Sequence, residues 1–184
     1  MEKEKIKQLE VTIATPEDAR QIKEVSYQSW LATYPNEEAG ITLDDIQDRL
    51  SDALSDEKIA KKIEQIAQAS VDERYLVVKE DGRVVGFCHA KKYPDKNQLH
   101  AIYVLPGYEG RGIGTKLWAE VKKFFDADKE TLVEVAAYNA NAINFYRKMG
   151  FKGTGKVFKD ERLKMKSGAI IPQTEMVIAT EETN

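Results

Sequence analysis

The segment from residue 100 to residue 118 constrains the possible folds of this chain more than any other part of the sequence. An apolar run at residues 99–104 has the length and composition of a buried β-strand. A turn follows in which three glycines alternate, namely Gly110, Gly112 and Gly114. An amphipathic helix begins directly after them, with Leu117 and Val121 on one face. A strand, a glycine-rich turn and a helix in this order predict an α/β protein.

The glycine-rich turn is suited to binding a phosphate group. Glycine adopts backbone conformations that are closed to other residues, and it lets a ligand approach the main chain. The first amides of a helix have no partner within the helix, and they point outward at the positive end of its dipole. We therefore expect this turn to bind a phosphate or a pyrophosphate.

Two familiar glycine motifs do not fit the turn. A dinucleotide-binding fingerprint, G-x-G-x-x-G, would need a glycine at position 115, where the chain has Thr115. A Walker P-loop closes with G-K-S or G-K-T, and the sequence contains neither triplet. A glycine-rich turn that binds no ligand is the remaining alternative.

Apolar periodicity predicts the other elements. A strand is expected at 9–13, a helix from 15 to about 33, and one or two amphipathic helices between 42 and 68, with a break near 55–56. Strands follow at 75–79 and 83–91, joined by an Asp-Gly turn typical of hairpins. The remaining expected elements are a strand at 99–104, a helix at 112–126, a strand at 132–136, a helix at 140–149, a strand from 150 and a strand at 174–178. This order indicates an α/β fold with a mixed central sheet.

Composition narrows the class of protein. The chain has 184 residues and a formal net charge of −3, which suits one domain with a sizeable core and disfavours a nucleic-acid partner. No apolar run approaches the roughly 20 residues of a membrane helix, and no signal-peptide pattern follows Met1. The only cysteine, Cys88, lies in an apolar run and is expected in the core. We expect a cytoplasmic domain with no membrane partner and no metal.

Charged residues are unevenly distributed along the chain. Residues 37–57 contain eight acidic residues and one base, Arg49. Residues 147–166 contain eight bases and two acids, Asp160 and Glu161. Solvated surfaces would explain both runs. The alternative is that the acidic run attracts a cationic ligand and the basic run lies near an anionic one.

Two motifs together resemble the GNAT superfamily of acetyl-CoA-dependent N-acetyltransferases. The turn resembles the coenzyme A motif of that family, (Q/R)-x-x-G-x-(G/A), with Glu109, Gly112 and Gly114 at its three defined positions. Residues 139–151, N-A-N-A-I-N-F-Y-R-K-M-G-F, are similar to the family pattern N-x-x-A-x-x-F-Y-x-x-x-G-F. The resemblance is detailed over about residues 73–159, and the first 70 residues match only in general layout.

The resemblance implies a GNAT-like fold with a mixed, mostly antiparallel central sheet flanked by helices on both faces. One N-acetyltransferase domain is expected over 1–184, with a core at 9–180, acceptor-side helices at about 16–68 and the acetyl-CoA-binding part at about 73–159. The implied reaction moves an acetyl group from acetyl-CoA to a primary amine by direct attack in a ternary complex. The amine is a polyamine, a small amine or a protein amino group, and the acidic run favours a cationic one.

Other functions stay open from the sequence alone. The scaffold could use another acyl-CoA, or it could bind coenzyme A as a sensor without turnover. A nucleotide-binding domain of another family is a third alternative. Members of the GNAT family are often dimers, which leaves a homodimer open.

The resemblance also implies roles for particular residues. Main-chain contacts to the pantetheine arm are expected from Ile102, Tyr103 and Val104. The pyrophosphate is expected at the backbone of the turn, formed by Gly110, Arg111, Gly112, Ile113, Gly114 and Thr115. Asn139 matches the family residue that binds the pantetheine arm, although it or Asn141 could be a plain helix cap. Arg147 and Lys148 are expected near the phosphates of coenzyme A.

Catalytic roles are implied for two residues. Tyr146 matches the family tyrosine that protonates the departing thiolate, and a packed helix aromatic is its alternative. Gln98 stands where some family members have a glutamate as general base, and an amide cannot serve. His100 is two residues further along the strand and has a suitable pKa, so it is the first candidate for the base. Glu134 is the second candidate, and a chain of waters is the alternative.

Glu109 departs from the family pattern, because a carboxylate replaces Gln or Arg beside the expected pyrophosphate. It would lower affinity for coenzyme A if the side chain pointed at the phosphates, and no side-chain role in binding is assigned to it.

Overall fold

The computed structural model describes residues 9–180 as seven strands, five α-helices and one 3-10 turn. The strands are β1 (Glu10–Ile13), β2 (Glu73–Glu80), β3 (Arg83–Lys92), β4 (Asn97–Val104), β5 (Thr131–Ala136), β6 (Lys152–Lys164) and β7 (Ile170–Ile178). The helices are α1 (Ala19–Thr33), α2 (Leu43–Arg49), α3 (Asp56–Ala67), α4 (Ile113–Lys122) and α5 (Ala140–Lys148), and the 3-10 turn η1 (Pro16–Asp18) precedes α1. The charged segment 1–7, in which we expect no signal peptide, lies outside the described residues.

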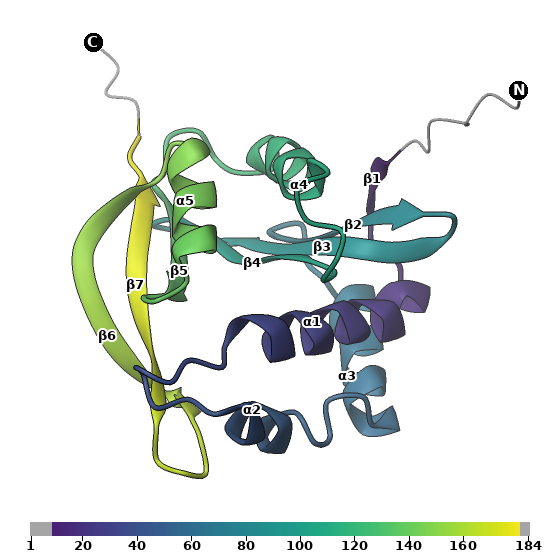
Figure 1. Cartoon of the computed structure of the whole chain (residues 1–184). Helices are drawn as coiled ribbons and strands as arrows, with labels where there is room; N and C mark the ends of the chain where they lie inside the picture. The colour runs from purple at the N-terminus through teal and green to yellow at the C-terminus, as the bar shows by residue number, and fades with distance from the viewer. Residues whose placement is uncertain (1–8, 181–184) are drawn as a thin grey trace, which may run out of the picture.

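All seven strands form one sheet, in the order β1-β2-β3-β4-β5-β7-β6. Neighbouring strands are antiparallel except β4 and β5, which are parallel. Helices α4 and α5 lie on one face and α1, α2 and α3 on the other (Figure 1). The mixed, mostly antiparallel sheet with helices on both faces, predicted from the sequence, is therefore confirmed. Within residues 9–180, no helix is long and apolar enough to cross a bilayer.

Polar side chains at two helix starts account for boundaries that the sequence predicts. The Thr42 hydroxyl accepts a hydrogen bond from the Asp45 amide at 3.1 Å, and the Asp45 carboxylate accepts one from the Thr42 amide at 3.0 Å, as in a capping box. The Ser55 hydroxyl accepts a hydrogen bond from the Lys58 amide at 3.3 Å and caps α3. The break expected near 55–56 is thus real, and it separates α2 from α3.

Each face of the sheet has its own apolar core. On the α4–α5 face the buried core includes Leu99, Leu117, Val121 and Phe151, together with Cys88, as predicted for that cysteine. On the α1–α3 face Ile22 and Val25 pack against Val77 and Phe87. A third cluster joins Ile46 of α2 to Ile171 of β7. Burial of this apolar area is the main term that holds the helices in place around the sheet.

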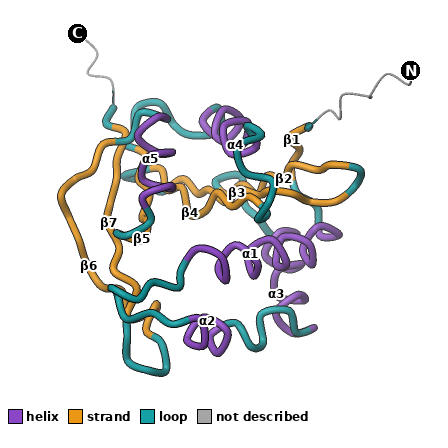
Figure 2. Tube along the Cα trace, in the orientation of Figure 1, coloured by secondary structure: helices purple, strands orange, loops and turns teal. Residues whose placement is uncertain are grey.

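Strands β4 and β5 separate partway along their length, and this gap positions the site (Figure 2). They pair only at residues 97–99 and 131–133. Beyond that point β4 stays paired with β3, whereas β5 stays paired with β7. Residues 100–104 therefore have one main-chain edge without a strand partner.

The register between β3 and β4 shifts by one residue just where the gap begins. His89 pairs with Ala101 and Ala90 pairs with Leu99, so His100 is the extra residue of a β-bulge. Bulges redirect a side chain and are common beside functional sites. The bulge therefore sets where the imidazole of His100 points.

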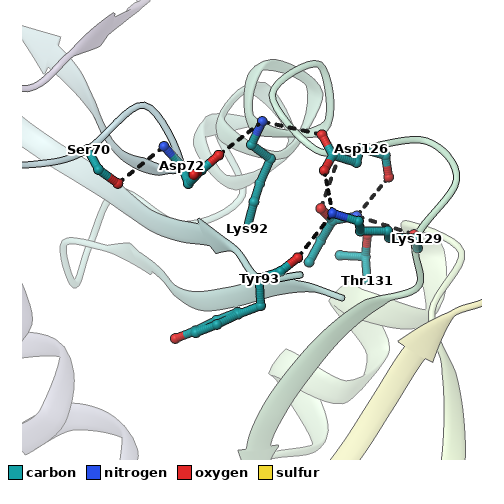
Figure 3. Close-up of polar contacts among 8 residues, drawn as sticks. Ser70, Asp72, Lys92, Tyr93, Asp126, Lys129 and Thr131 are labelled. Carbon is teal, nitrogen blue, oxygen red and sulfur yellow. Dashed lines mark hydrogen bonds and ion pairs between the residues drawn. The ribbon is translucent and has the colours of Figure 1, made fainter. Parts of the chain in front are cut away.

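The end of β4 remote from the gap is fixed by buried polar contacts. Asn97 is fully buried, and its amide nitrogen donates to the carbonyl oxygens of Asp126 at 2.8 Å and Lys129 at 3.2 Å. Figure 3 shows Lys92 between the carboxylates of Asp72 and Asp126, and Lys129 bound to Asp126. These contacts hold the chain after α4 in a turn. The helix therefore ends at Lys122, whereas the sequence predicted that it would extend to residue 126.

Candidate functional site

A cavity of about 850 Å³ lies in the gap between β4 and β5. Its walls are the free edge of β4, the glycine-rich turn, the start of α5 and the end of α1. It brings together most of the site residues selected from the sequence: His100, Ile102, Tyr103, Val104, Gly110, Gly112, Ile113, Gly114, Thr115, Asn139 and Tyr146. Residues from two distant motifs thus meet in one cavity.

The glycine-rich turn presents the open end of α4 to this cavity. Gly112 is the N-cap of α4 with φ of 77°, a conformation that favours glycine, and no side chain caps the first amides of the helix. Gly114 has no side chain where a Cβ would lie 3.2 Å from the ring of Phe145. Close packing of α4 on α5 therefore depends on glycine at this position.

Gly86 of β3 lies against the start of α4, and nothing in the sequence around Gly86 marked it as a residue of the site. A Cβ at Gly86 would lie 2.6 Å from Ile113 Cγ2 and 3.2 Å from the carbonyl oxygen of Tyr103. The first residue of α4 can therefore sit directly on the sheet only because residue 86 is glycine.

The cavity fits a coenzyme A derivative in two respects. The free edge of β4 offers main-chain hydrogen-bonding groups to an extended ligand, as an edge strand does. The uncapped amides of α4 offer donors to a phosphate group. Asn139 caps α5, since its Oδ1 accepts from the Ala142 amide at 3.0 Å, and it also lines the cavity.

Three residues that were expected near the cofactor do not line the cavity, namely Arg111, Arg147 and Lys148. The guanidinium of Arg111 pairs with the carboxylate of Glu80 on β2 and lies over the ring of Tyr108, 4.9 Å from its centroid. Lys148 is in the last turn of α5, about 13 Å along the helix from its N-cap at 1.5 Å per residue. Neither side chain therefore lines the cavity, and the main-chain contact expected of Arg111 and the phosphate contact expected of Lys148 stay predictions.

Glu109 lines the cavity, but its carboxylate is engaged within the turn. One carboxylate oxygen accepts a hydrogen bond from the Gly107 amide at 2.6 Å. The residue that departs from the family pattern thus closes the turn that carries the glycines.

Four tyrosines gather where the cavity meets the sheet. The hydroxyl groups of Tyr34 and Tyr103 are 3.0 Å apart, and the Tyr138 hydroxyl donates to the Tyr34 carbonyl oxygen at 2.7 Å. Tyr146 is 6% exposed, yet its hydroxyl forms no hydrogen bond with any other residue in 9–180. Burial raises the pKa of Tyr146, so its hydroxyl stays protonated.

Tyr34 and Tyr138 were missed in the sequence. Tyr34 follows α1, in the part of the chain where the resemblance is only general, and the signal that could have found it is the Tyr-Pro break after that helix. Tyr138 lies one residue before the Asn motif and had no pattern of its own.

A second cavity of about 270 Å³ adjoins the first. Both cavities are lined by Tyr34, His100, Tyr103 and Glu134. The rest of the smaller cavity is formed by α1, α2, the start of β4, β6 and β7, and it includes Trp30, Arg49, Asp160 and Arg162. Two ligands in the two cavities would therefore meet at the four shared residues.

The acidic run 37–57 does not form the wall of either cavity as its charge suggested. Its only charged residue that lines the smaller cavity is the base Arg49, which donates to the carbonyl oxygen of Arg162 at 2.7 Å. Asp48 instead pairs with Lys166 at 3.0 Å, and Asp45 caps α2. The carboxylates that do line the cavity belong to Glu134 and Asp160.

The two candidate bases lie at the junction of the cavities. Partial burial lowers the pKa of His100, and the ring lies near its neighbour His89, with 4.8 Å between centroids. The carboxylate of Glu134 is exposed and makes no ion pair or hydrogen bond with another residue in 9–180. Gln98 is buried and lines only the smaller cavity.

A glycine turn at a helix start, a free strand edge and an adjoining second cavity form a site with room for two ligands side by side. Residues 26–151 match the family model of the acetyltransferase (GNAT) family, and the chain belongs to that family. It is a GNAT-type acetyl-CoA-dependent N-acetyltransferase.

The relatives agree with this assignment. The chain is 30% identical over 149 residues to spermidine N(1)-acetyltransferase of Thermoplasma acidophilum, which covers 78% of this chain and 88% of that protein. It is 35% identical over 94 residues to an N-alpha-acetyltransferase of Sulfurisphaera tokodaii, with 42% of this chain and 56% of the relative covered. The chain thus matches about half the length of the second relative.

Solved structures share the fold. The PaiA N-acetyltransferase of Thermoplasma acidophilum, solved in complex with coenzyme A, has a TM-score of 0.72 at 25% identity and covers 94% of this chain and 99% of its own. YncA of Salmonella typhimurium, solved with acetyl-CoA, has a TM-score of 0.60 at 19% identity, covers 95% of both chains and supports the fold alone.

Proposed function

We propose that this enzyme transfers the acetyl group of acetyl-CoA, held in the larger cavity, to a primary amine held in the smaller one. The proposal rests on one observation: four residues line both cavities, namely Tyr34, His100, Tyr103 and Glu134. Two substrates bound side by side there need no covalent enzyme intermediate, because proximity replaces it. We place the reaction in the cytoplasm, in a single domain over residues 1–184.

Acetyl-CoA supplies an activated thioester. Its extended arm would pair with the free main-chain edge at Ile102, Tyr103 and Val104, and the N-terminal amides of α4 would hold its pyrophosphate. A main-chain N–H near Val104 would stabilise charge that develops on the thioester oxygen. Asn139 retains the two N–H donors of its amide for the same ligand, since only its oxygen caps α5.

Tyr146 is the proton donor to the departing thiolate in this proposal. Tyr146 lines the larger cavity, and its hydroxyl is protonated and has no protein partner in 9–180, so it is free to donate to a ligand. A positioned general acid contributes about 10²- to 10⁴-fold to the rate.

His100 is the general base that removes a proton from the acceptor. A primary amine is a cation at neutral pH and must lose a proton before it attacks. The lowered pKa of His100 keeps the imidazole neutral and able to accept that proton. Glu134 supplies a negative charge that attracts the cation, because its exposed carboxylate lies at the junction and forms no hydrogen bond or ion pair within 9–180, although it interacts electrostatically with Arg162 of the same cavity.

The acceptor that we favour is a polyamine. The exposed carboxylate of Glu134 at the junction supports a cationic acceptor, and the relative at 30% identity is named a spermidine N(1)-acetyltransferase. The attraction is assigned to Glu134 and not to the acidic run 37–57, which does not line the cavity with acids.

Calorimetric titration with acetyl-CoA, succinyl-CoA and coenzyme A, followed by thiol-release assays on an amine panel that includes spermidine, tests the proposal. We expect selective acetyl-CoA binding and thiol release with a cationic amine. In Glu134→Gln the KM for the amine should rise about tenfold, with the Kd for acetyl-CoA unchanged. Tight binding without turnover on any amine would favour a coenzyme A sensor, and preferred turnover of succinyl-CoA would favour another acyl donor.

A further inference from the structure

His89 of β3 lies between two other rings that belong to the neighbouring strands. On the β2 side the ring of Tyr75 is stacked on it, with centroids 4.2 Å apart and an angle of 3° between planes. On the β4 side the ring of His100 is stacked at 4.8 Å and 23°. Three strands thus carry a row of stacked rings that ends at the junction of the two cavities.

Glu73 of β2 anchors this row. One carboxylate oxygen lies 2.7 Å from Nε2 of His89, and the Tyr75 hydroxyl donates to the same oxygen at 3.3 Å. Lys91 lies 3.9 Å from the other carboxylate oxygen. Burial works against the ionised form, yet the hydrogen bond from His89 and the charge of Lys91 hold the pKa of Glu73 below its usual value.

An ionised Glu73 fixes the tautomer of His89. A carboxylate can only accept, so Nε2 of His89 carries the hydrogen and donates it. Burial lowers the pKa of His89 to about 4, so this ring is neutral at neutral pH. The side chain is 22% exposed, which leaves it little freedom to turn.

His100 needs such support because it is the extra residue of the bulge. Regular pairing does not hold a bulged residue in the ladder, and its direction depends on side-chain contacts. Among residues 9–180, the only hydrogen bond to its ring is a long one, 3.4 Å from Nε2 to the hydroxyl of Tyr93, whose ring lies edge-on to it. Of the two ring contacts that His100 makes in the described part of the chain, the stack on His89 is the closer.

We propose that Glu73 and His89 form a positioning pair for His100, in which the carboxylate fixes the His89 ring and that ring holds the His100 imidazole at the junction of the cavities. The inference rests on the proposed role of His100 as the base. Neither residue lines a described cavity, so both act through His100 and not on the substrate.

The charged groups around Glu73 and His89 shift the pKa values of the two histidines. Glu73 raises the pKa of His100, whereas Lys91, Lys96 and Arg162 lower it. Lys62 of α3 lies over the ring of Tyr75 and lowers the pKa of His89, as does protonated His100. Tyr34, which follows α1, shares the cavity wall with His100, as do Tyr103 of β4 and Glu134 of β5.

Histidine NMR tests the pair without any substrate, because the chain contains only two histidines. In Glu73→Gln the amide oxygen still accepts from His89 but the charge is gone. We expect the titration midpoint of His100 to move to lower pH, and the acid limb of the pH–rate profile to move with it, since a base is lost only when pH falls through its pKa. Equal midpoints together with wild-type kcat in Glu73→Gln would overturn the proposal.

Activity of two His89 variants completes the test. His89→Ala should lower kcat about tenfold or more, with the Kd for acetyl-CoA unchanged, and His89→Phe should restore most of kcat because it keeps a stacked ring. Wild-type kcat in a folded His89→Ala protein would overturn the positioning role. A shifted NMR midpoint in Glu73→Gln together with full activity of His100→Gln would retain the pair but refute His100 as the base.

Discussion

The hydroxyl groups of Tyr34 and Tyr103 lie 3.0 Å apart, and the two side chains belong to the wall shared by both cavities. Tyr34 follows α1 and Tyr103 is on β4, so their hydrogen bond ties the helix to the free part of the strand. Burial raises the pKa of both groups, which keeps the bond between neutral hydroxyls. We expect Tyr34→Phe to lower the free energy of unfolding by about 1 kcal/mol and to raise the KM for the amine.

A double-mutant cycle with Tyr103→Phe separates this bond from other effects of the substitutions. Chemical denaturation of the four proteins should give a coupling energy of about 1 kcal/mol, because the residues are in direct contact. Additive losses would mean that the hydroxyl groups do not interact in solution.

Loss of the Tyr146 hydroxyl is expected to affect turnover and not stability. The hydroxyl has no protein partner within 9–180, so Tyr146→Phe leaves no group unsatisfied. We predict that kcat falls about 10²- to 10⁴-fold while the melting temperature and the Kd for acetyl-CoA stay at the wild-type values. A fall in melting temperature with full turnover would assign the hydroxyl a structural role.

The carboxylate of Glu109 should weaken coenzyme A binding through its charge. Glu109→Gln keeps an oxygen that can accept from the Gly107 amide but removes a negative charge from the cavity wall. We expect calorimetry to show coenzyme A binding about three- to tenfold tighter, with a smaller gain at high salt. Weaker binding in the variant would show that the carboxylate itself supports the turn.

Asn97 is expected to matter for stability alone. It is fully buried and binds the main chain of Asp126 and Lys129 as well as the Thr131 hydroxyl. Asn97→Ala would leave these groups without their hydrogen-bond partner, and the free energy of unfolding should fall by about 2–4 kcal/mol. Because the site lies at the other end of β4, the Kd for acetyl-CoA should change less than about twofold at a temperature where the variant is folded. A large loss of affinity in the folded variant would contradict that separation.

Much of the fold could be predicted because its signals are local. Apolar periodicity and the polar residues Thr42 and Ser55 mark helix faces and starts, and the Asp-Gly turn at 81–82 marks the hairpin. The ends of strands were predicted less well. Strand β7 begins at Ile170 and not at residue 174, because pairing with β6 extends the strand through Pro172 to a point just after Gly168.

The site could be predicted where one short motif supplies both the residues and their geometry. The glycine turn and the Asn–Tyr helix meet as expected, because Gly114 of α4 packs closely against the ring of Phe145 in α5. The contacts that were missed join segments far apart in the chain, such as Tyr34 with Tyr103 and Arg111 with Glu80. The bulge at His100 depends on a register between two strands, which no window of one strand can reveal.

Simultaneous measurement of free coenzyme A and acetylated amine, with acetyl-CoA and spermidine as substrates, tests the central claim most directly. We predict that both products appear in a 1:1 ratio, that neither forms when one substrate is withheld, and that Tyr146→Phe slows both to the same extent. Thiol release without acetylated amine, for spermidine and for every other amine tested, would contradict acetyl transfer between the two joined cavities.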